Sequence, residues 1–368
     1  SSYLDIPRRH SNIPTMRRFQ RIHDVVEPIE EYRGGGYHPV HLGDIFHDRY
    51  QIIGKWGYGT FSTVWLARDL RRQKDVTLKI IKADASKTSK ELSILLQLSK
   101  AETPPPGKDH IIELLDHFEH TGPNGLHLVL VFPAMLSDGE KLCERGKPRS
   151  AGYIRSISLR IITALEFLHR QGFVHTGKCD SINDILMPPE YSPVRWLPGV
   201  KIDQTAPEYL MVSQRPRGLL DDVNISSLVV KIGDLGAAVH NGDNSSVPVT
   251  PLALRAPELL ENLPWDFKID VWSLGCLLFQ LATNEPLFVL TEFGCTSDEL
   301  KENLKSLILK FVGAGRDQLA VYLGERLPPD FGAENADKLS SFLWSMLQQT
   351  PQGRSSMSDL LAHPFLNE

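Results

Sequence analysis

Residues 57–64 read Gly57-Tyr58-Gly59-Thr60-Phe61-Ser62-Thr63-Val64, a glycine-containing turn that separates two strand-like runs. The first run begins at Tyr50, and the second continues to Arg68. Glycines at the tip of a hairpin let backbone amides approach phosphate oxygens, because no Cβ stands in the way. The turn therefore predicts a phosphate-binding loop, in which the contacting residues are Gly57, Gly59, Ser62 and Val64. Taken alone the pattern is weak, and an ordinary glycine hairpin would explain it better.

Two charged residues downstream strengthen the prediction of a nucleotide site. Lys79 ends the strand-like motif Val76-Thr77-Leu78-Lys79, and Glu91 lies in the run 89–98, whose apolar residues recur at helical spacing. A strand lysine that is held by a helix carboxylate can reach the α- and β-phosphates of a nucleotide. Each charge alone is typical of a solvated surface residue. In this order, behind the glycine turn, the two predict a nucleotide-binding pair.

A third motif, Asp234-Leu235-Gly236, follows the strand-like run 229–232. A carboxylate at the end of a strand can bind magnesium through its oxygens. The tripeptide alone is a common turn, but further motifs follow it in order, at Ala256-Pro257-Glu258, at 270–275 (DVWSLG) and at Arg354. So many elements in one order argue against coincidence, and we assign Asp234 to metal binding.

Composition limits the class of protein. The chain has 368 residues, 41% of them hydrophobic, with a net charge of −5 and a pI near 6.2. This balance argues against a general nucleic-acid binder, which would carry a basic excess. The four cysteines lie far apart, which favours a reduced intracellular protein over a disulfide scaffold or a zinc site. No apolar run approaches the roughly 20 residues that span a bilayer, so we expect no membrane insertion.

The order of the predicted elements indicates an α+β fold of two lobes, a small β-rich N-lobe and a larger α-helical C-lobe. Strand-like runs dominate the first part, at 50–81, 110–115 and 126–132. Amphipathic helical runs dominate from residue 150 onward, at 153–168, 270–282, 298–312, 336–348 and 357–362. Strands followed by helices predict segregated layers, unlike alternating βαβ units.

We predict three parts along the chain. Residues 1–49 form an N-terminal extension, 50–135 form the N-lobe as far as the hinge, and 136–368 form the C-lobe. The extension begins with an arginine-rich tail, which is either a flexible basic segment or an organelle presequence. We favour the flexible segment, because no apolar face repeats in it. An insertion rich in proline and turn residues covers 188–227 of the C-lobe.

Taken together, these motifs resemble the eukaryotic protein kinase superfamily over residues 50–366. Within it, the chain resembles the SR-protein kinase family, which phosphorylates arginine–serine-rich splicing factors. Its overall sequence is similar to that of fungal members. The residues that carry this closer resemblance are 31–40 (EYRGGGYHPV) with Gly43-Asp44, 59–67 (GTFSTVWLA), His175-Thr176 and Asp234-Leu235-Gly236. The place of the insertion also fits the family, although this insertion is far shorter than the family's long spacers.

The resemblance implies a serine/threonine kinase that uses ATP and magnesium and takes part in the regulation of mRNA splicing. We also expect a monomer of the cytoplasm and nucleus that binds neither nucleic acid nor membrane directly. By the same resemblance, Phe132 is the gatekeeper beside the adenine, and Pro133 and Met135 belong to the hinge. Glu258 is expected to pair with Arg354, and Asp270 is expected to brace the catalytic loop.

The segment 173–187, FVHTGKCDSINDILM, departs from the family pattern His-x-Asp-x-Lys-x-x-Asn-Ile-Leu. In that pattern the Asp is the catalytic base and the Asn holds magnesium. Counting forward from His175 places the base at Gly177, whereas counting back from Ile185 places it at Cys179. The loop therefore carries a net insertion, and no residue satisfies both counts.

Four residues of this loop are candidates for the missing chemistry. We predict Asp180 as the catalytic base, because it is the one carboxylate near the base position, and Lys178 as the group that holds the transferring phosphate. Asn183 or Asp184 could face the second magnesium. The alternative is an ATP-binding pseudokinase with a scaffold or regulatory role. A misplacement of about 1 Å can cost ~100-fold in rate, whereas nucleotide binding does not depend on this loop.

An arginine-rich substrate requires an acidic surface. Asp298, Glu299 and Glu302 begin a predicted helix at spacings that group carboxylates on adjacent faces. These residues are the candidate docking patch for Arg/Ser-rich proteins. The ordinary explanation is a solvated helix start, where the helix dipole favours acidic residues.

Overall fold

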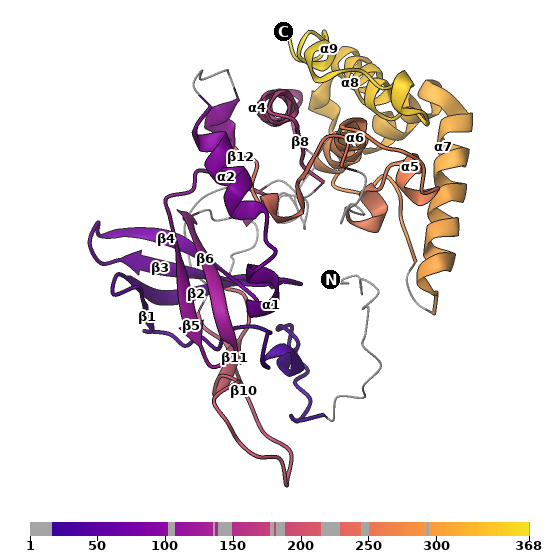
Figure 1. The fold of residues 1–368 in the computed structure, drawn as a ribbon. Coiled ribbons are helices and arrows are strands. Elements are labelled where there is room, and N and C mark those ends of the chain that lie inside the picture. Colours follow the sequence, from indigo (N-terminus) through magenta and orange to yellow (C-terminus); the bar gives the residue numbers. More distant parts are fainter. Residues whose placement is uncertain are drawn as a thin grey trace.

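The computed structural model describes residues 17–101, 107–134, 137–138, 149–176, 180–181, 188–214, 229–243, 250–291 and 294–367. These residues form a twisted β-sheet, flanked by helix α2 (Glu91–Ser99), and a separate body of helices (Figure 1). The predicted α+β fold, with a β-rich first lobe and a helical second lobe, is confirmed. Met135, at the predicted end of the first lobe, lies outside the described residues.

The sheet of the N-lobe is antiparallel and has the strand order β1-β2-β3-β4-β6-β5. Its strands are β1 (Ile45–Phe46), β2 (Tyr50–Gly59), β3 (Ser62–Asp69), β4 (Lys74–Ile81), β5 (Asp116–Gly122) and β6 (Gly125–Pro133). The strands predicted at 50–81 and 126–132 are confirmed, whereas the strand predicted at 110–115 is wrong. There the backbone bonds of His110 and Ile112 go to Ile232 in the other lobe, so this part of the segment links the lobes, while Leu115 at its end bonds to Val131 of β6.

The C-lobe is built from helices. They are α4 (Ala151–Arg170), α5 (Pro257–Leu260), α6 (Lys268–Thr283), α7 (Ser297–Arg326), α8 (Ala333–Met346) and α9 (Met357–Leu361), while α1 (Ala83–Ser86) precedes α2 in the N-lobe. Short 3-10 helices cover Ile29–Glu31, Lys108–His110, Leu235–Ala237, Leu252–Leu254, Pro329–Phe331 and Pro351–Gly353. All predicted helices are present. Helix α7 runs past its predicted end at 312, but it is interrupted at Gly315, whose φ of 78° and ψ of −177° are not helical.

Two apolar layers hold the sheet in place. Successive side chains of strand β6 belong alternately to two apolar clusters. The first cluster contains Val129 and Val131, and the second contains Leu128, Leu130 and Phe132. This alternation follows from the two-residue period of a strand, which sends neighbouring side chains to opposite faces. The second cluster continues through α2 into the helices of the C-lobe, so the two lobes share a core. No helix in the described part of the chain is long and apolar enough to cross a membrane.

Short strands bring the predicted catalytic loop beside the metal-binding motif. Strands β7 (Ser137–Asp138), β9 (Asp180–Ser181) and β12 (Val230–Lys231) form a small sheet in the order β12-β9-β7. Strand β8 (Phe173–Val174) pairs with β13 (Val239–His240). Strands β8 and β9, which both belong to the segment 173–187, thus pair with β13 and β12. These two partner strands lie on either side of Asp234 in the sequence.

The insertion reaches back to the N-lobe. It contains the hairpin of β10 (Tyr191–Pro193) and β11 (Tyr209–Met211), which extends from the lower end of the sheet in Figure 1. Met211 is buried in the apolar cluster on the sheet. Beyond it, Gln214 exchanges two 2.9 Å hydrogen bonds with the backbone of Lys55 on β2. Trp196 of the insertion pairs with Phe19 of the N-terminal extension, so the two segments pack against each other.

Candidate active site

Three charged residues from three different elements meet at one point. Lys79 lies on β4, Glu91 begins α2, and Asp234 follows β12. Lys79 Nζ lies 2.9 and 2.7 Å from the two carboxylate oxygens of Glu91 and 2.6 Å from Asp234 Oδ1. Glu91 is buried, whereas the side chain of Asp234 is 62% exposed. One ammonium group therefore joins a buried carboxylate to an open one.

Burial and charge act against each other in this cluster. Burial alone would lower the pKa of Lys79, but the carboxylates of Asp234 and Glu91 outweigh it and raise that pKa. Burial raises the pKa of Glu91, and the nearby ammonium offsets only part of this effect. The charge of Lys79 holds the pKa of Asp234 below its usual value. At neutral pH the open carboxylate is therefore ionised beside a cation.

The backbone around Asp234 is shaped to bring the chain close to the cluster. Asp234 has a left-handed conformation, with φ 55° and ψ 57°. Two residues later, a Cβ on Gly236 would lie 3.1 Å from Glu91 Oε2 and 3.5 Å from Lys79 Nζ. Glycine therefore leaves room for the charged groups to meet. The sequence pattern marked Gly236 only as part of a motif and did not indicate this contact.

The glycine turn lies at one end of the sheet. Gly57 and Gly59 are in β2, and they pair with Val64 and Ser62 of β3, respectively. Lys79 faces Val64 across the β3–β4 pair, so the lysine and the turn lie on neighbouring strands. At the predicted hinge, Phe132 and Pro133 end strand β6, and Phe132 is buried opposite Thr77 of β4. Five of the predicted nucleotide contacts are thus adjacent in the sheet, namely Gly57, Gly59, Ser62, Val64 and Lys79.

In the C-lobe, Asp270 of α6 braces the start of the catalytic loop. Its carboxylate accepts backbone hydrogen bonds from His175 at 2.8 Å and from Thr176 at 3.0 Å. His169 Nε2 lies 3.0 Å from the same carboxylate. Burial alone would raise the pKa of Asp270, but these partners outweigh it and lower that pKa. The bracing role predicted for Asp270 is confirmed, whereas the contribution of His169 was not predicted.

The predicted pair of Glu258 and Arg354 is also confirmed. The guanidinium of Arg354 donates to both carboxylate oxygens of Glu258, each at 2.7 Å, and both residues are buried. Such a two-pronged contact fixes the orientation of both side chains. The pair ties helix α5 to the chain just before α9.

The catalytic loop itself is described only in part. The backbone of Asp180 belongs to β9, where it pairs with Lys231 of β12, three residues before Asp234. The other predicted loop residues, Lys178, Asn183 and Asp184, lie outside the described residues, and so does the side chain of Asp180. The roles given to these four residues stay predictions.

The candidate docking patch lies at the start of α7. Asp298 and Glu302 are 91% and 70% exposed, and each forms an ion pair with a lysine three residues later, Lys301 and Lys305. Glu299 forms a capping box with Thr296 at the helix start. Local lysines therefore offset part of the acidic charge that the sequence predicted for this patch.

The N-terminal extension contributes contacts that the sequence did not indicate. The hydroxyl of Tyr37 donates a 2.7 Å hydrogen bond to the carbonyl oxygen of Gly59 in the glycine turn. Glu27 forms an ion pair with Lys55 of β2, and both side chains are fully buried. The described part of the extension, residues 17–49, has little regular structure, so its pattern held no signal for these contacts.

A comparison with protein families identifies the fold. The family model for the protein kinase domain matches residues 50–177 and 215–366. These segments contain the glycine turn, the Lys79–Glu91–Asp234 cluster and the Glu258–Arg354 pair. The stretch between them, 178–214, holds Asp180 and the β10–β11 hairpin. The match therefore breaks off within the catalytic loop.

Individual relatives narrow the family. The chain is 31% identical to the serine/threonine-protein kinase SRPK of Physarum polycephalum, over 92% of this chain and 91% of the relative. It is 28% identical to the protein kinase dsk1 of Schizosaccharomyces pombe, over 93% of this chain and 85% of the relative. The serine/threonine-protein kinase SKY1 of Saccharomyces cerevisiae is 38% identical over 41% of this chain and 22% of its own length. The chain thus belongs to the protein kinase family, as an SRPK-like serine/threonine protein kinase.

Proposed function

We propose that this kinase transfers the γ-phosphoryl group of ATP to serine in arginine–serine-rich proteins, among them splicing factors. One observation carries the proposal, the contact of Lys79 with both Glu91 and Asp234. Phosphoryl transfer depends mainly on positioning and on the stabilisation of charge. A lysine fixed by two carboxylates, beside a glycine turn, supplies both for the phosphates of ATP.

Magnesium fits the open carboxylate of this cluster. Asp234 offers hard oxygen ligands, and Mg²⁺ is commonly bound by one or two carboxylates together with substrate phosphates. Among the described residues, no group of three or more potential metal-binding side chains comes together. We therefore propose that Asp234 holds the ion jointly with the nucleotide and with Asn183 or Asp184. The bound ion would neutralise the charge that develops on the phosphates.

The remaining steps fall to the catalytic loop. We propose that Asp180 accepts the proton of the substrate hydroxyl and that Lys178 steadies the transferring phosphoryl group. Asp270 supports this work indirectly, because it holds the backbone of His175 and Thr176 at the start of the loop.

A second candidate function is an ATP-binding pseudokinase that acts as a scaffold or regulator. Two observations favour it. The kinase family match is interrupted between residues 177 and 215, and the backbone of Asp180 is engaged in a strand beside β12. Both observations leave the Lys79–Glu91–Asp234 cluster intact. Both functions therefore include nucleotide binding, and only the kinase transfers a phosphoryl group to a substrate.

A transfer assay separates the two functions. The full chain would be incubated with γ-labelled ATP, magnesium and an arginine–serine repeat peptide, in parallel with Asp180→Ala and with Asp75→Asn as a surface control. Label on the peptide that Asp180→Ala abolishes, and Asp75→Asn retains, would support the kinase with Asp180 as its base. No label from the unmutated chain, although MgATP stabilises it against heat, would support the pseudokinase.

The substrate class and the location extend the proposal. We propose that the patch at Asp298, Glu299 and Glu302 attracts the arginines of the substrate, and that the enzyme works in the cytoplasm and nucleus. Removing all three acids together should raise KM for the arginine–serine peptide and leave KM for ATP unchanged. Equal KM values for the peptide would exclude this patch as the docking surface.

A further inference from the structure

The segment 31–37 of the N-terminal extension approaches the glycine turn and the strand that carries Lys79. Its closest approach is the 2.7 Å hydrogen bond from the Tyr37 hydroxyl to the carbonyl oxygen of Gly59. Gly59 is the last residue of β2, at the tip of the turn. On the other side of this tip, Lys82 donates its backbone N–H to the carbonyl oxygen of Phe61 at 2.8 Å. The tip is therefore held at two peptide units.

Tyr37 is itself anchored from several directions. Its side chain is buried, and the ammonium of Lys82 lies 4.2 Å from its ring centroid. The same ammonium donates a 2.8 Å hydrogen bond to Glu31. Asn124 donates to the backbone carbonyl of Tyr37 at 2.6 Å. A buried ring with a fixed backbone has little freedom, so its hydroxyl is a preorganised donor.

The extension packs closely against α1 at Gly35 and folds closely back on itself at Gly36. A Cβ on Gly35 would lie 2.2 Å from a carboxylate oxygen of Asp84, and one on Gly36 would lie 1.8 Å from the carbonyl oxygen of Glu31. The backbone amides of Ala83 and Asp84 donate to the carbonyls of Gly36 and Gly35. These contacts fix the position of Tyr37 relative to the chain that connects β4 with α2.

We propose that Tyr37 is a positioning residue of the nucleotide site, which sets the peptide unit between Gly59 and Thr60. In a planar trans peptide the N–H points opposite to the C=O. A carbonyl held toward Tyr37 therefore turns the Thr60 amide away from the extension and keeps the tip of the turn in one conformation. Backbone amides of such a turn bind phosphate oxygens, so the contact acts on the phosphates of ATP and not on its adenosine part.

This inference rests on the proposed nucleotide site, and Tyr37→Phe tests it in the full chain. The variant keeps the buried ring and removes only the hydroxyl. Titrations with MgATP and with adenosine should show a dissociation constant for MgATP that is raised by up to about 5-fold, the limit set by the free energy of one hydrogen bond that no longer holds the turn. The dissociation constant for adenosine should not change, because adenosine has no phosphate.

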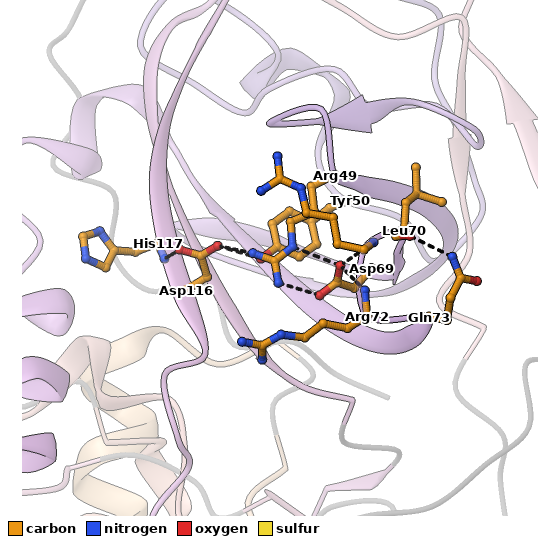
Figure 2. A network of polar contacts seen from close by, with 9 residues as sticks. Arg49, Tyr50, Asp69, Leu70, Arg72, Gln73, Asp116 and His117 are labelled. Atoms are coloured by element: carbon orange, nitrogen blue, oxygen red, sulfur yellow. Dashed lines mark hydrogen bonds and ion pairs between the residues drawn. The ribbon is translucent and has the colours of Figure 1, made fainter.

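Tyr50→Phe provides a matched control. The Tyr50 hydroxyl donates a 2.7 Å hydrogen bond to Asp116, equal in length to the bond from Tyr37 to Gly59 (Figure 2). Tyr50 is the first residue of β2, whereas Gly59 is the last. The control should lose stability and keep the ratio of the two dissociation constants. The inference is overturned if Tyr37→Phe binds MgATP as tightly as the unmutated chain, or if it loses MgATP and adenosine affinity to the same extent.

Hydrogen exchange separates a failure of this inference from a failure of the proposed function. Amides of residues 57–63 should exchange faster in Tyr37→Phe than in Tyr50→Phe, without any nucleotide present. If the unmutated chain binds no nucleotide, the proposed function fails, and the exchange rates alone decide whether Tyr37 holds the turn. Equal exchange in all three proteins would contradict the positioning role.

Discussion

Replacing Glu27 by glutamine should strongly destabilise the protein. Glu27 and Lys55 form an ion pair in which both side chains are fully buried. Burial lowers the pKa of Lys55, and the attraction of Glu27 offsets only part of this effect. Glutamine has nearly the same size as glutamate and keeps an oxygen that can accept the 2.6 Å hydrogen bond from the Tyr32 hydroxyl. The substitution therefore removes the charge and little else.

The expected loss is about 3–5 kcal/mol of unfolding free energy, because one member of a buried ion pair is left uncompensated. The rings of Trp65 and Tyr58, with centroids 5.3 and 5.8 Å from Lys55 Nζ, cannot replace a carboxylate. A cation–π contact contributes only about 0.5–2 kcal/mol. A typical domain has a total stability of about 5–15 kcal/mol, so the loss is large.

Urea unfolding of the full chain measures this loss, with two further variants. The double variant Glu27→Gln with Lys55→Met should recover most of the stability, because replacing both charges of a buried pair is often nearly neutral. Asp75→Asn removes the exposed partner of Arg68 in the same sheet and should cost less than about 1 kcal/mol. The reasoning is refuted if Glu27→Gln costs no more than Asp75→Asn, or if the double variant is less stable than Glu27→Gln.

Three further outcomes are expected. Burial lowers the pKa of His38 to about 3, so the fold keeps this residue neutral while the unfolded chain takes up a proton below about pH 6.5. Through His38, the free energy of unfolding should therefore be about 2 kcal/mol lower at pH 5 than at pH 7.5. The melting temperature of His38→Gln should fall less between pH 7.5 and 5.0 than that of the unmutated chain. Gly236→Ala should weaken MgATP binding, measured by titration, because the new Cβ would crowd Glu91 Oε2. Asp270→Asn should lower kcat in the transfer assay at least ~10-fold with KM for ATP unchanged, since only one oxygen acceptor remains for two backbone amides.

The sequence was sufficient for most of the fold. Strand and helix periods alone located β2, β3, β4, β6 and the main helices, because their apolar faces are regular. The strand predicted at 110–115 failed, since its apolar residues pair with Ile232 in the other lobe, and local propensity does not reveal such a partner. The end predicted for α7 at 312 lies close to the real interruption at Gly315, where the backbone leaves the helical region.

The candidate site could be predicted where the motifs follow one another along the chain in the order of the kinase pattern. Lys79, Glu91 and Asp234 come from distant parts of the sequence, and their order along the chain marked them as one cluster. Tyr37 and Glu27 could not be found in this way, because they lie in a segment with little regular structure. Their contacts with Gly59 and Lys55 depend on how that segment docks. The roles of the residues around Asp180 could not be assigned for another reason, since the extra residues in this segment of the sequence remove the register that the motif would provide.

The most direct test of the account is whether the Lys79–Glu91–Asp234 cluster binds MgATP. Melting temperatures of the unmutated chain and of Asp234→Asn would be compared with MgATP, with ATP and EDTA, and with adenosine. At 100 times its dissociation constant, a ligand adds about 2.7 kcal/mol of stability. We expect MgATP to stabilise the unmutated chain more than either other condition, and Asp234→Asn to lose the part that depends on magnesium. The same response to magnesium in both proteins, or no stabilisation of the unmutated chain, would contradict the assignment of this site.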